Sequence, residues 1–141
     1  MNRILAIDYG RRRIGLAISD PLGLTARGIT TISVENRLEA VQAVVKSALK
    51  WEVKELLVGL PLNMDGSKGF MANNVEAFVE ELIAETDLPV IFWDERLSTV
   101  SAHRILQEMG KKGHKRKKMI DQMAAALFLE AYLQFRLEKP L

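Results

Sequence analysis

The stretch that decides the fold is residues 4–19, which read Ile-Leu-Ala-Ile-Asp-Tyr-Gly-Arg-Arg-Arg-Ile-Gly-Leu-Ala-Ile-Ser. Its first four residues are apolar and are followed by turn-forming residues, which predicts a buried strand over 4–7 and a hairpin turn after it. The second apolar run predicts a partner strand over 14–19. The β-branched content of 26–33 predicts a third strand, so the chain opens with three meandering strands.

After these strands the apolar residues recur at helical spacing. Asn36 is a candidate N-cap, with Glu39 placed as in a capping box, for a helix that runs to Leu49. The remaining elements expected are a strand over 56–59, a helix around 71–82, a fifth strand over 90–93, and helices over 98–109 and 119–137. This order predicts an α/β fold: a mixed five-stranded sheet, three strands as a meander and then βαβαβ-type crossovers, flanked by helices in one domain, 1–141.

Composition excludes several classes of site. The chain has 141 residues, no cysteine and two histidines, His103 and His114, which excludes disulfides, thiolate zinc sites and a cysteine nucleophile. Any metal must therefore be held mainly by oxygen. The longest apolar run, 123–129, is far shorter than a membrane span, so we expect a cytoplasmic protein with no membrane partner.

The net charge of +2 conceals an uneven distribution. Residues 111–118 hold six of the 20 Lys and Arg residues and no acid, which leaves 14 cations against 18 acids in the rest of the chain. Such a run is either a solvated loop or a contact for a nucleic-acid backbone. Arg11, Arg12 and Arg13, in the predicted hairpin turn, are either a second such contact or an exposed turn.

Three acids stand where the apolar pattern breaks. Asp8 and Glu95 follow predicted strands, and Asp121 lies in the apolar first turns of the last helix. Each has a plain structural alternative: a turn residue, a solvated strand end and an acid that the helix dipole stabilises. Asp94 should point away from Glu95, so at most one of the two is expected to face Asp8.

Ligands of such sheets gather at the carboxyl ends of the parallel strands, where these three acids could converge. Three anions without a cation would repel one another. Mg²⁺ or Mn²⁺ prefers carboxylate oxygens, water and phosphate, and two such ions can activate a water and stabilise the departing oxygen of a phosphodiester. The acids and the basic run together predict metal-dependent phosphodiester hydrolysis on a nucleic acid.

Four motifs in order resemble the YqgF/RuvX family of RNase H-like nucleases. They are Asp8-Tyr9-Gly10 with Ile14-Gly15-Leu16-Ala17, then Gly59-Leu60-Pro61-Leu62-Asn63-Met64-Asp65-Gly66-Ser67, then Asp94-Glu95-Arg96-Leu97-Ser98-Thr99, and Asp121 with Ala124-Ala125. The second and third motifs are highly specific, and together the four cover essentially the whole chain. Arg11 departs from the Thr or Ser that is common after Gly10, which argues against a nucleotide phosphate loop there.

The resemblance implies an RNase H-like fold and a metal-dependent endonuclease with Asp8, Glu95 and Asp121 as its catalytic and metal-binding residues. In this hypothesis Asp8 bridges two ions, Glu95 completes the ligand set and Asp121 holds the second ion. The implied role is processing of the 5′ end of pre-16S rRNA. The expected partner is structured RNA, either free or within a ribosomal particle. The nucleic-acid-binding residues expected are Arg11, Arg12, Arg13, Asn63, Arg96, Lys111, Lys112, Lys115, Arg116, Lys117 and Lys118, the basic ones between 111 and 118 forming a mobile loop. Plainer interpretations are a turn for Asn63 and a surface ion pair for Arg96.

Three other functions remain open at this point. A Holliday junction resolvase would use the same metals on branched DNA and would need a dimer for paired nicks, whereas the nuclease is expected as a monomer or weak homodimer. An ATP-binding module shares the strand, Asp-x-Gly and hairpin opening, but 141 residues leave no second lobe. A non-catalytic RNA-binding protein would use the basic run alone.

Overall fold

The computed structural model describes residues 3–100 and 114–138. Their elements follow in the order β1 (Ile4–Tyr9), β2 (Arg13–Ser19), β3 (Ala26–Ser33), α1 (Arg37–Lys50), β4 (Glu55–Leu60), α2 (Phe70–Glu85), β5 (Val90–Asp94), the 3₁₀ helix η1 (Glu95–Leu97) and α4 (His114–Glu138). The five predicted strands are all present. The sequence analysis did not predict the single turn of η1.

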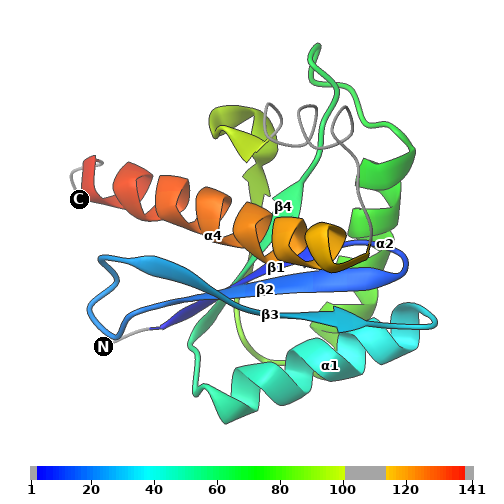
Figure 1. Cartoon of the computed structure of the whole chain (residues 1–141), viewed down its shortest axis with the longest axis horizontal. Coiled ribbons are helices and arrows are strands. Elements are labelled where there is room, and N and C mark those ends of the chain that lie inside the picture. Colours follow the sequence, from blue (N-terminus) through cyan, green and yellow to red (C-terminus); the bar gives the residue numbers. More distant parts are fainter. Residues whose placement is uncertain (1–2, 101–113, 139–141) are drawn as a thin grey trace.

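The strands form one sheet in the order β3-β2-β1-β4-β5 (Figure 1). β1, β2 and β3 pair antiparallel, whereas β1 pairs parallel with β4, and β4 with β5. The parallel strands are joined by α1 and α2, as crossover connections require. The predicted mixed sheet, a meander followed by crossovers, is confirmed.

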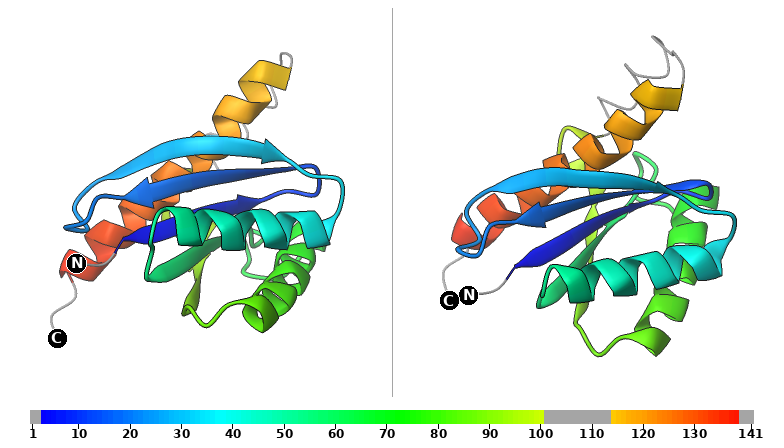
Figure 2. Two further views of the ribbon diagram at one scale, coloured as in Figure 1. Left: turned by 90° about the horizontal axis from the view of Figure 1, so that it is seen from below. Right: turned by 60° about the horizontal axis from the view of Figure 1, so that its bottom comes forward.

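Helices cover the two faces of the sheet differently. α1 and α2 lie against one face and α4 crosses the other (Figure 2). Leu5 and Ile7 pack in a core with α1 and α2, whereas Ile4 and Ala6 pack in a second core with Phe128 of α4. This alternation along β1 follows from the two-residue period of a strand, and it carries the next even position, Asp8, toward the α4 face.

Asp8 is part of β1 and not of a turn. The sequence predicted that the strand stops at Ile7, but β1 continues to Tyr9, and Asp8 pairs with Gly15 of β2 in the antiparallel register. Tyr9 remains in the sheet because its ring stacks on Phe78 of α2, with the ring centroids 4.3 Å apart. Turn formation therefore does not account for Asp8, and the plain alternative for this acid is wrong.

The last helix begins earlier than the sequence predicted. It was expected from about Met119, but α4 runs from His114, so the backbone over 114–118 is helical and not the expected loop. The prediction placed the start of the helix too late because cations in a first turn are unfavourable to the helix dipole. Lys and Arg are nevertheless good helix formers, and the helix includes them. Of the helix predicted over 98–109, residues 98 and 99 are not helical, residue 100 is helical, and residues 101–109 lie outside the described residues.

The predicted cap of α1 is confirmed with one adjustment. The Asn36 side chain accepts a hydrogen bond of 2.9 Å from the backbone N–H of Glu39, as an N-cap does. Glu39 in turn accepts from the N–H of Glu35, one residue before the cap. This second bond fixes where α1 begins relative to the end of β3.

α4 is the longest helix among the described residues. It has 25 residues and begins with a basic segment. Among residues 3–100 and 114–138, no helix combines the length and the apolar character that crossing a membrane would require.

Candidate active site

A pocket of about 590 Å³ opens at the carboxyl ends of the parallel strands. It is lined by the three predicted acids and the three hairpin arginines, together with uncharged residues: Asp8, Tyr9, Gly10, Arg11, Arg12, Arg13, Pro61, Met71, Glu95 and Asp121. The structure therefore brings together acids that are 26 to 113 positions apart in the chain, as the sequence argument expected.

Asp8 and Glu95 are the two acids among the buried residues described. Asp8 is 6% exposed and Glu95 is 2% exposed. Glu95 begins η1 directly after β5, whereas Asp94 caps η1 by accepting a hydrogen bond from the N–H of Arg96. The expectation that only one of the two neighbouring acids shares a site with Asp8 agrees with this geometry. The structure thus places two buried carboxylates in the wall of one pocket.

Gly59 makes room for the Glu95 carboxylate. A Cβ on Gly59 would lie 2.6 Å from Oε2 of Glu95 and 2.7 Å from Cε2 of Phe128. Because the Phe128 ring is fully buried, it cannot move aside. The absence of a side chain at Gly59 is therefore what allows the carboxylate to lie over β4.

Gly15 has the same role for Asp121. A Cβ there would overlap the backbone carbonyl of Asp121, so α4 crosses β2 at a distance that only glycine permits. Asp8 pairs with Gly15 across the β1–β2 ladder. The bare backbone of Gly15 thus brings Asp121 close to the strand pair that carries Asp8.

The hairpin arginines have different partners. Nε of Arg13 donates to Oδ2 of Asp121 over 2.6 Å, with the two side chains 28% and 14% exposed. The Arg11 guanidinium lies over the ring of Phe70, 5.4 Å from its centroid. Arg12 is exposed, and its backbone carbonyl accepts from Val34. The turn is thus held at both sides, and its cations line the pocket.

The donor set suits a hard divalent cation. Carboxylate oxygens are the ligands that Mg²⁺ and Mn²⁺ prefer, and the pocket offers three carboxylates without cysteine or histidine. In the described ranges, however, no three His, Cys, Asp or Glu residues are grouped as a metal site. The Asp121 carboxylate is held by Arg13 instead, so the chemistry of the site fits a metal while one donor is engaged by a cation of the chain.

Asn63 closes the loop between β4 and α2. Its side-chain amide donates to Oγ of Ser67 over 2.9 Å, and its backbone carbonyl accepts from Gly66. Ser67 also donates to Asp65, and these hydrogen bonds lower the pKa of the Asp65 carboxyl. The turn interpretation of Asn63 agrees with these contacts, and its contact with nucleic acid stays a prediction.

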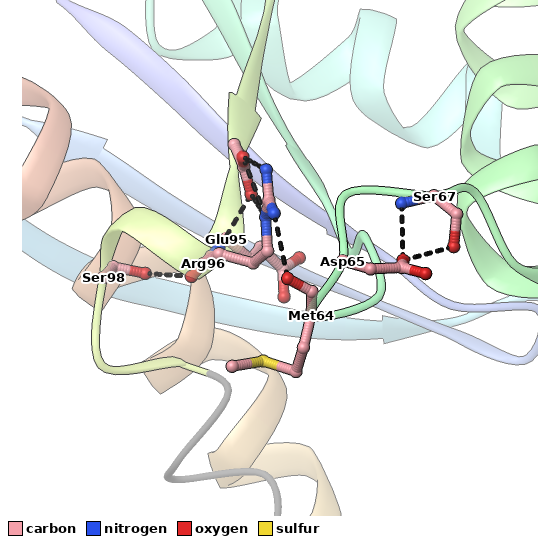
Figure 3. Close-up of polar contacts among 7 residues, drawn as sticks. Met64, Asp65, Ser67, Glu95, Arg96 and Ser98 are labelled. Carbon is pink, nitrogen blue, oxygen red and sulfur yellow. Dashed lines mark hydrogen bonds and ion pairs between the residues drawn. The ribbon is translucent and has the colours of Figure 1, made fainter.

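Arg96 joins η1 to the same loop (Figure 3). Its guanidinium donates to both carboxylate oxygens of Asp94, with Nη2 to Oδ2 at 2.7 Å, and Nη1 donates to the carbonyl of Met64 over 3.2 Å. The hydrogen bonds from Arg96 hold the pKa of Asp94 below its usual range. Because Asp94 and Arg96 flank Glu95, this ion pair fixes the turn that carries the buried acid.

The basic run is only partly within the described residues. Lys111 and Lys112 lie outside them. Lys115, Arg116, Lys117 and Lys118 lie on the backbone of the first turns of α4, and their side chains are not described. They precede Asp121 on the same helix, so this end of α4 leads to the pocket.

Several residues that shape the site were not predicted from the sequence. Tyr9, Pro61 and Met71 line the pocket. Tyr9 and Pro61 fall within the quoted motifs, but none of the three was predicted to belong to the site. Gly15 and Gly59 did carry a signal, because an isolated glycine inside an apolar strand indicates close approach of another segment.

Comparison with known proteins identifies relatives over nearly the whole chain. Residues 2–135 match the family model RuvX, which is described as Holliday junction resolvase. A protein of Moorella thermoacetica named pre-16S rRNA nuclease is 47% identical over 131 residues, 93% of this chain and 94% of its own length. A protein of Halothermothrix orenii with the same name is 46% identical over 137 residues, 95% of this chain and 96% of its own.

Solved structures confirm the predicted RNase H-like fold. The RuvC protein of Thermus thermophilus in complex with a Holliday junction superposes with a TM-score of 0.62 over the full length of both chains, at 17% identity. The fowlpox virus resolvase bound to junction DNA gives a TM-score of 0.51 at 12% identity, covering 96% of this chain and 99% of its own. At these identities the likeness concerns the fold.

Proposed function

The chain belongs to the RuvX family, and from this premise we propose that it is a divalent-metal-dependent endonuclease that processes the 5′ end of pre-16S rRNA. The observation that carries the proposal is the single pocket shared by Asp8, Glu95 and Asp121 with the hairpin arginines. The names of relatives at 46% and 47% identity support a ribosomal RNA precursor as the substrate.

In this proposal the acids of the pocket bind the metal and its arginines bind the phosphate backbone. Asp8, Glu95 and Asp121 would hold Mg²⁺ or Mn²⁺, which supplies an activated water and charge stabilisation for the departing oxygen. Arg12 is exposed at the rim and would contact the phosphate backbone of the substrate. Arg11 presents its guanidinium on the Phe70 ring, so its orientation toward the pocket is fixed before the substrate arrives.

The test is a cleavage assay on a pre-16S rRNA fragment with Mg²⁺ or Mn²⁺. Asp8→Asn, Glu95→Gln and Asp121→Asn should each lower the cleavage rate by several orders of magnitude while RNA binding persists. Asp87→Asn is the matched control, because Asp87 is an exposed acid before β5, away from the pocket. Undiminished cleavage by Asp8→Asn would overturn the assignment of the site.

Resolution of Holliday junctions is the second candidate, favoured by the description of the family model. It requires two active sites for paired nicks, and therefore a dimer. A four-way DNA junction assayed beside the precursor RNA, with the mass of the protein measured under the same conditions, separates the two. A monomer that cuts the RNA and leaves the junction intact supports the ribosomal substrate.

A further inference from the structure

Three cationic side chains gather around one indole on the far side of the molecule from the pocket. Cζ of Arg3 lies 6.0 Å, Cζ of Arg27 5.5 Å and Nζ of Lys50 5.8 Å from the ring centre of Trp51. They come from the residue before β1, from β3 and from the last residue of α1. We call these four residues the Trp51 cluster.

The cluster gathers three positive charges that are not held in ion pairs within the protein. In the described part of the chain, none of its three cations forms an ion pair with an Asp or Glu. Each cation is attracted to the aromatic ring, but like charges around one ring repel one another. Lys50 also benefits from the dipole at the end of α1. Arg3 lies just before β1 and Arg27 lies in β3, so neither has this benefit, and a bound anion would stabilise the group.

Two further lysines extend the cationic surface. Lys46 is exposed one turn before Lys50 on α1, and such i, i+4 residues are neighbours on a helix surface. Lys54 is exposed, and its backbone N–H donates to the carbonyl of Arg3 over 2.9 Å. The cluster is therefore the centre of a patch and not an isolated contact.

The cluster and the pocket lie at opposite ends and on opposite faces of the sheet. The start of β1, the start of β3 and the end of α1 share one end in Figure 1, and the β1–β2 turn is at the other. Arg3 and Asp8 are five residues apart along an extended chain, about 17 Å. Trp51 packs against the core of α1 and α2, whereas Asp8 lies toward α4. No single phosphate can reach both sites.

We infer that the Trp51 cluster is a second binding surface for the phosphate backbone of the RNA substrate. The choice of RNA rests on the proposed function. Guanidinium and ammonium groups bind phosphate oxygens with charge-assisted hydrogen bonds, and the indole gathers three of these groups at one place on the surface. The substrate is then an RNA large enough to reach around the sheet, and a short RNA occupies the pocket alone.

The test measures RNA binding by the Asp8→Asn protein, which keeps the substrate uncut. Arg27→Gln and Lys50→Gln, singly and together, should weaken binding of a long structured precursor. The slope of log affinity against log salt should become shallower by about one for each cation removed. Binding of a short single-stranded RNA should not change. Arg37→Gln is the control, because Arg37 is a half-exposed cation at the other end of α1, where it pairs with Glu81.

Tryptophan emission gives a second readout. Trp51 is half-buried, whereas Trp93 is 6% exposed, so the long RNA should change the emission of the Trp51-containing protein and not that of Trp51→Phe. Thermal unfolding midpoints within a few degrees of one another establish that the variants fold.

Two outcomes separate this inference from the proposed function. If the double variant binds the long RNA with the affinity and salt slope of Arg37→Gln, the inference is wrong even where the wild type cleaves RNA. If the wild type cleaves no RNA but its binding depends on the cluster, the inference holds and the proposed function fails.

Discussion

Nε of Arg13 lies 2.6 Å from Oδ2 of Asp121, across 108 positions of sequence. The ion pair joins the first residue of β2 to α4 and places a cation of the chain on an acid that is proposed to bind a metal. A divalent ion bound there would compete with Arg13 for this carboxylate. It would leave the guanidinium available to a phosphate of the substrate.

Arg13→Gln should therefore bind divalent cations more tightly. Removing a positive charge in contact with a ligand carboxylate favours a cation there, and we expect affinity for Mn²⁺ to rise about tenfold, or about 1.4 kcal/mol. Calorimetric titration of the purified protein with Mn²⁺ measures this directly. Arg12→Gln removes a pocket arginine that has no ion pair with Asp121 in the described structure. Equal Mn²⁺ affinity in the two variants would contradict the competition.

The fold could be predicted from the sequence because its signals are local. Apolar runs and the capping residues around Asn36 decide the strands and α1 without reference to the rest of the chain. The ends of β1 and α4 could not be predicted in this way. Asp8 is kept in the strand by its pairing with Gly15 and by the stacking of Tyr9 on Phe78, which are contacts between distant parts of the sequence.

The close approach of α4 to β2 predicts a graded response to glycine substitution. Gly15→Ala forces a Cβ into the Asp121 carbonyl, and this should move α4, lower the free energy of unfolding by about 1–3 kcal/mol and abolish most cleavage. Gly28→Ala is the milder comparison, since its Cβ would lie 3.1 Å from the carbonyl of Gln122. Thermal unfolding and the RNA cleavage rate measure both effects. Cleavage by Gly15→Ala at the rate of Gly28→Ala would show that the crossing distance does not position Asp121.

Tyr132 should titrate well above an ordinary tyrosine. Burial and the hydrogen bond of 2.7 Å that its hydroxyl donates to Glu55 raise the pKa of Tyr132 from 10.0 to about 12. Since the folded state holds the proton more tightly, the resulting stability is fully present below pH 10 and is lost as the pH rises through 12. Phenolate absorbance of the wild type minus that of Tyr132→Phe should show a midpoint near pH 12. A midpoint near 10 would contradict the contact with Glu55.

The site could be predicted only in part, because residue type does not reveal a side chain's partner. Asp8, Glu95 and Asp121 share one pocket. The break that each makes in an apolar pattern was a weak signal by itself, and the family motifs grouped the three. Asn63 and Arg96 belong to motifs of the same family, but the structure gives them hydrogen bonds within the protein. Their motif positions alone could not distinguish a residue that binds RNA from one that holds a loop.

Substitution by lysine distinguishes these roles for Arg96. Lysine keeps the charge that a phosphate needs but loses the forked contact with Asp94 and Met64. If Arg96 positions Glu95 and the loop, Arg96→Lys and Arg96→Gln should lose cleavage to the same extent, with RNA affinity kept and stability slightly lowered. Amide hydrogen exchange over 61–68 should become faster in both variants, because Met64 loses its donor. Restored cleavage in Arg96→Lys, with exchange unchanged from the wild type, would instead assign Arg96 to the phosphate backbone.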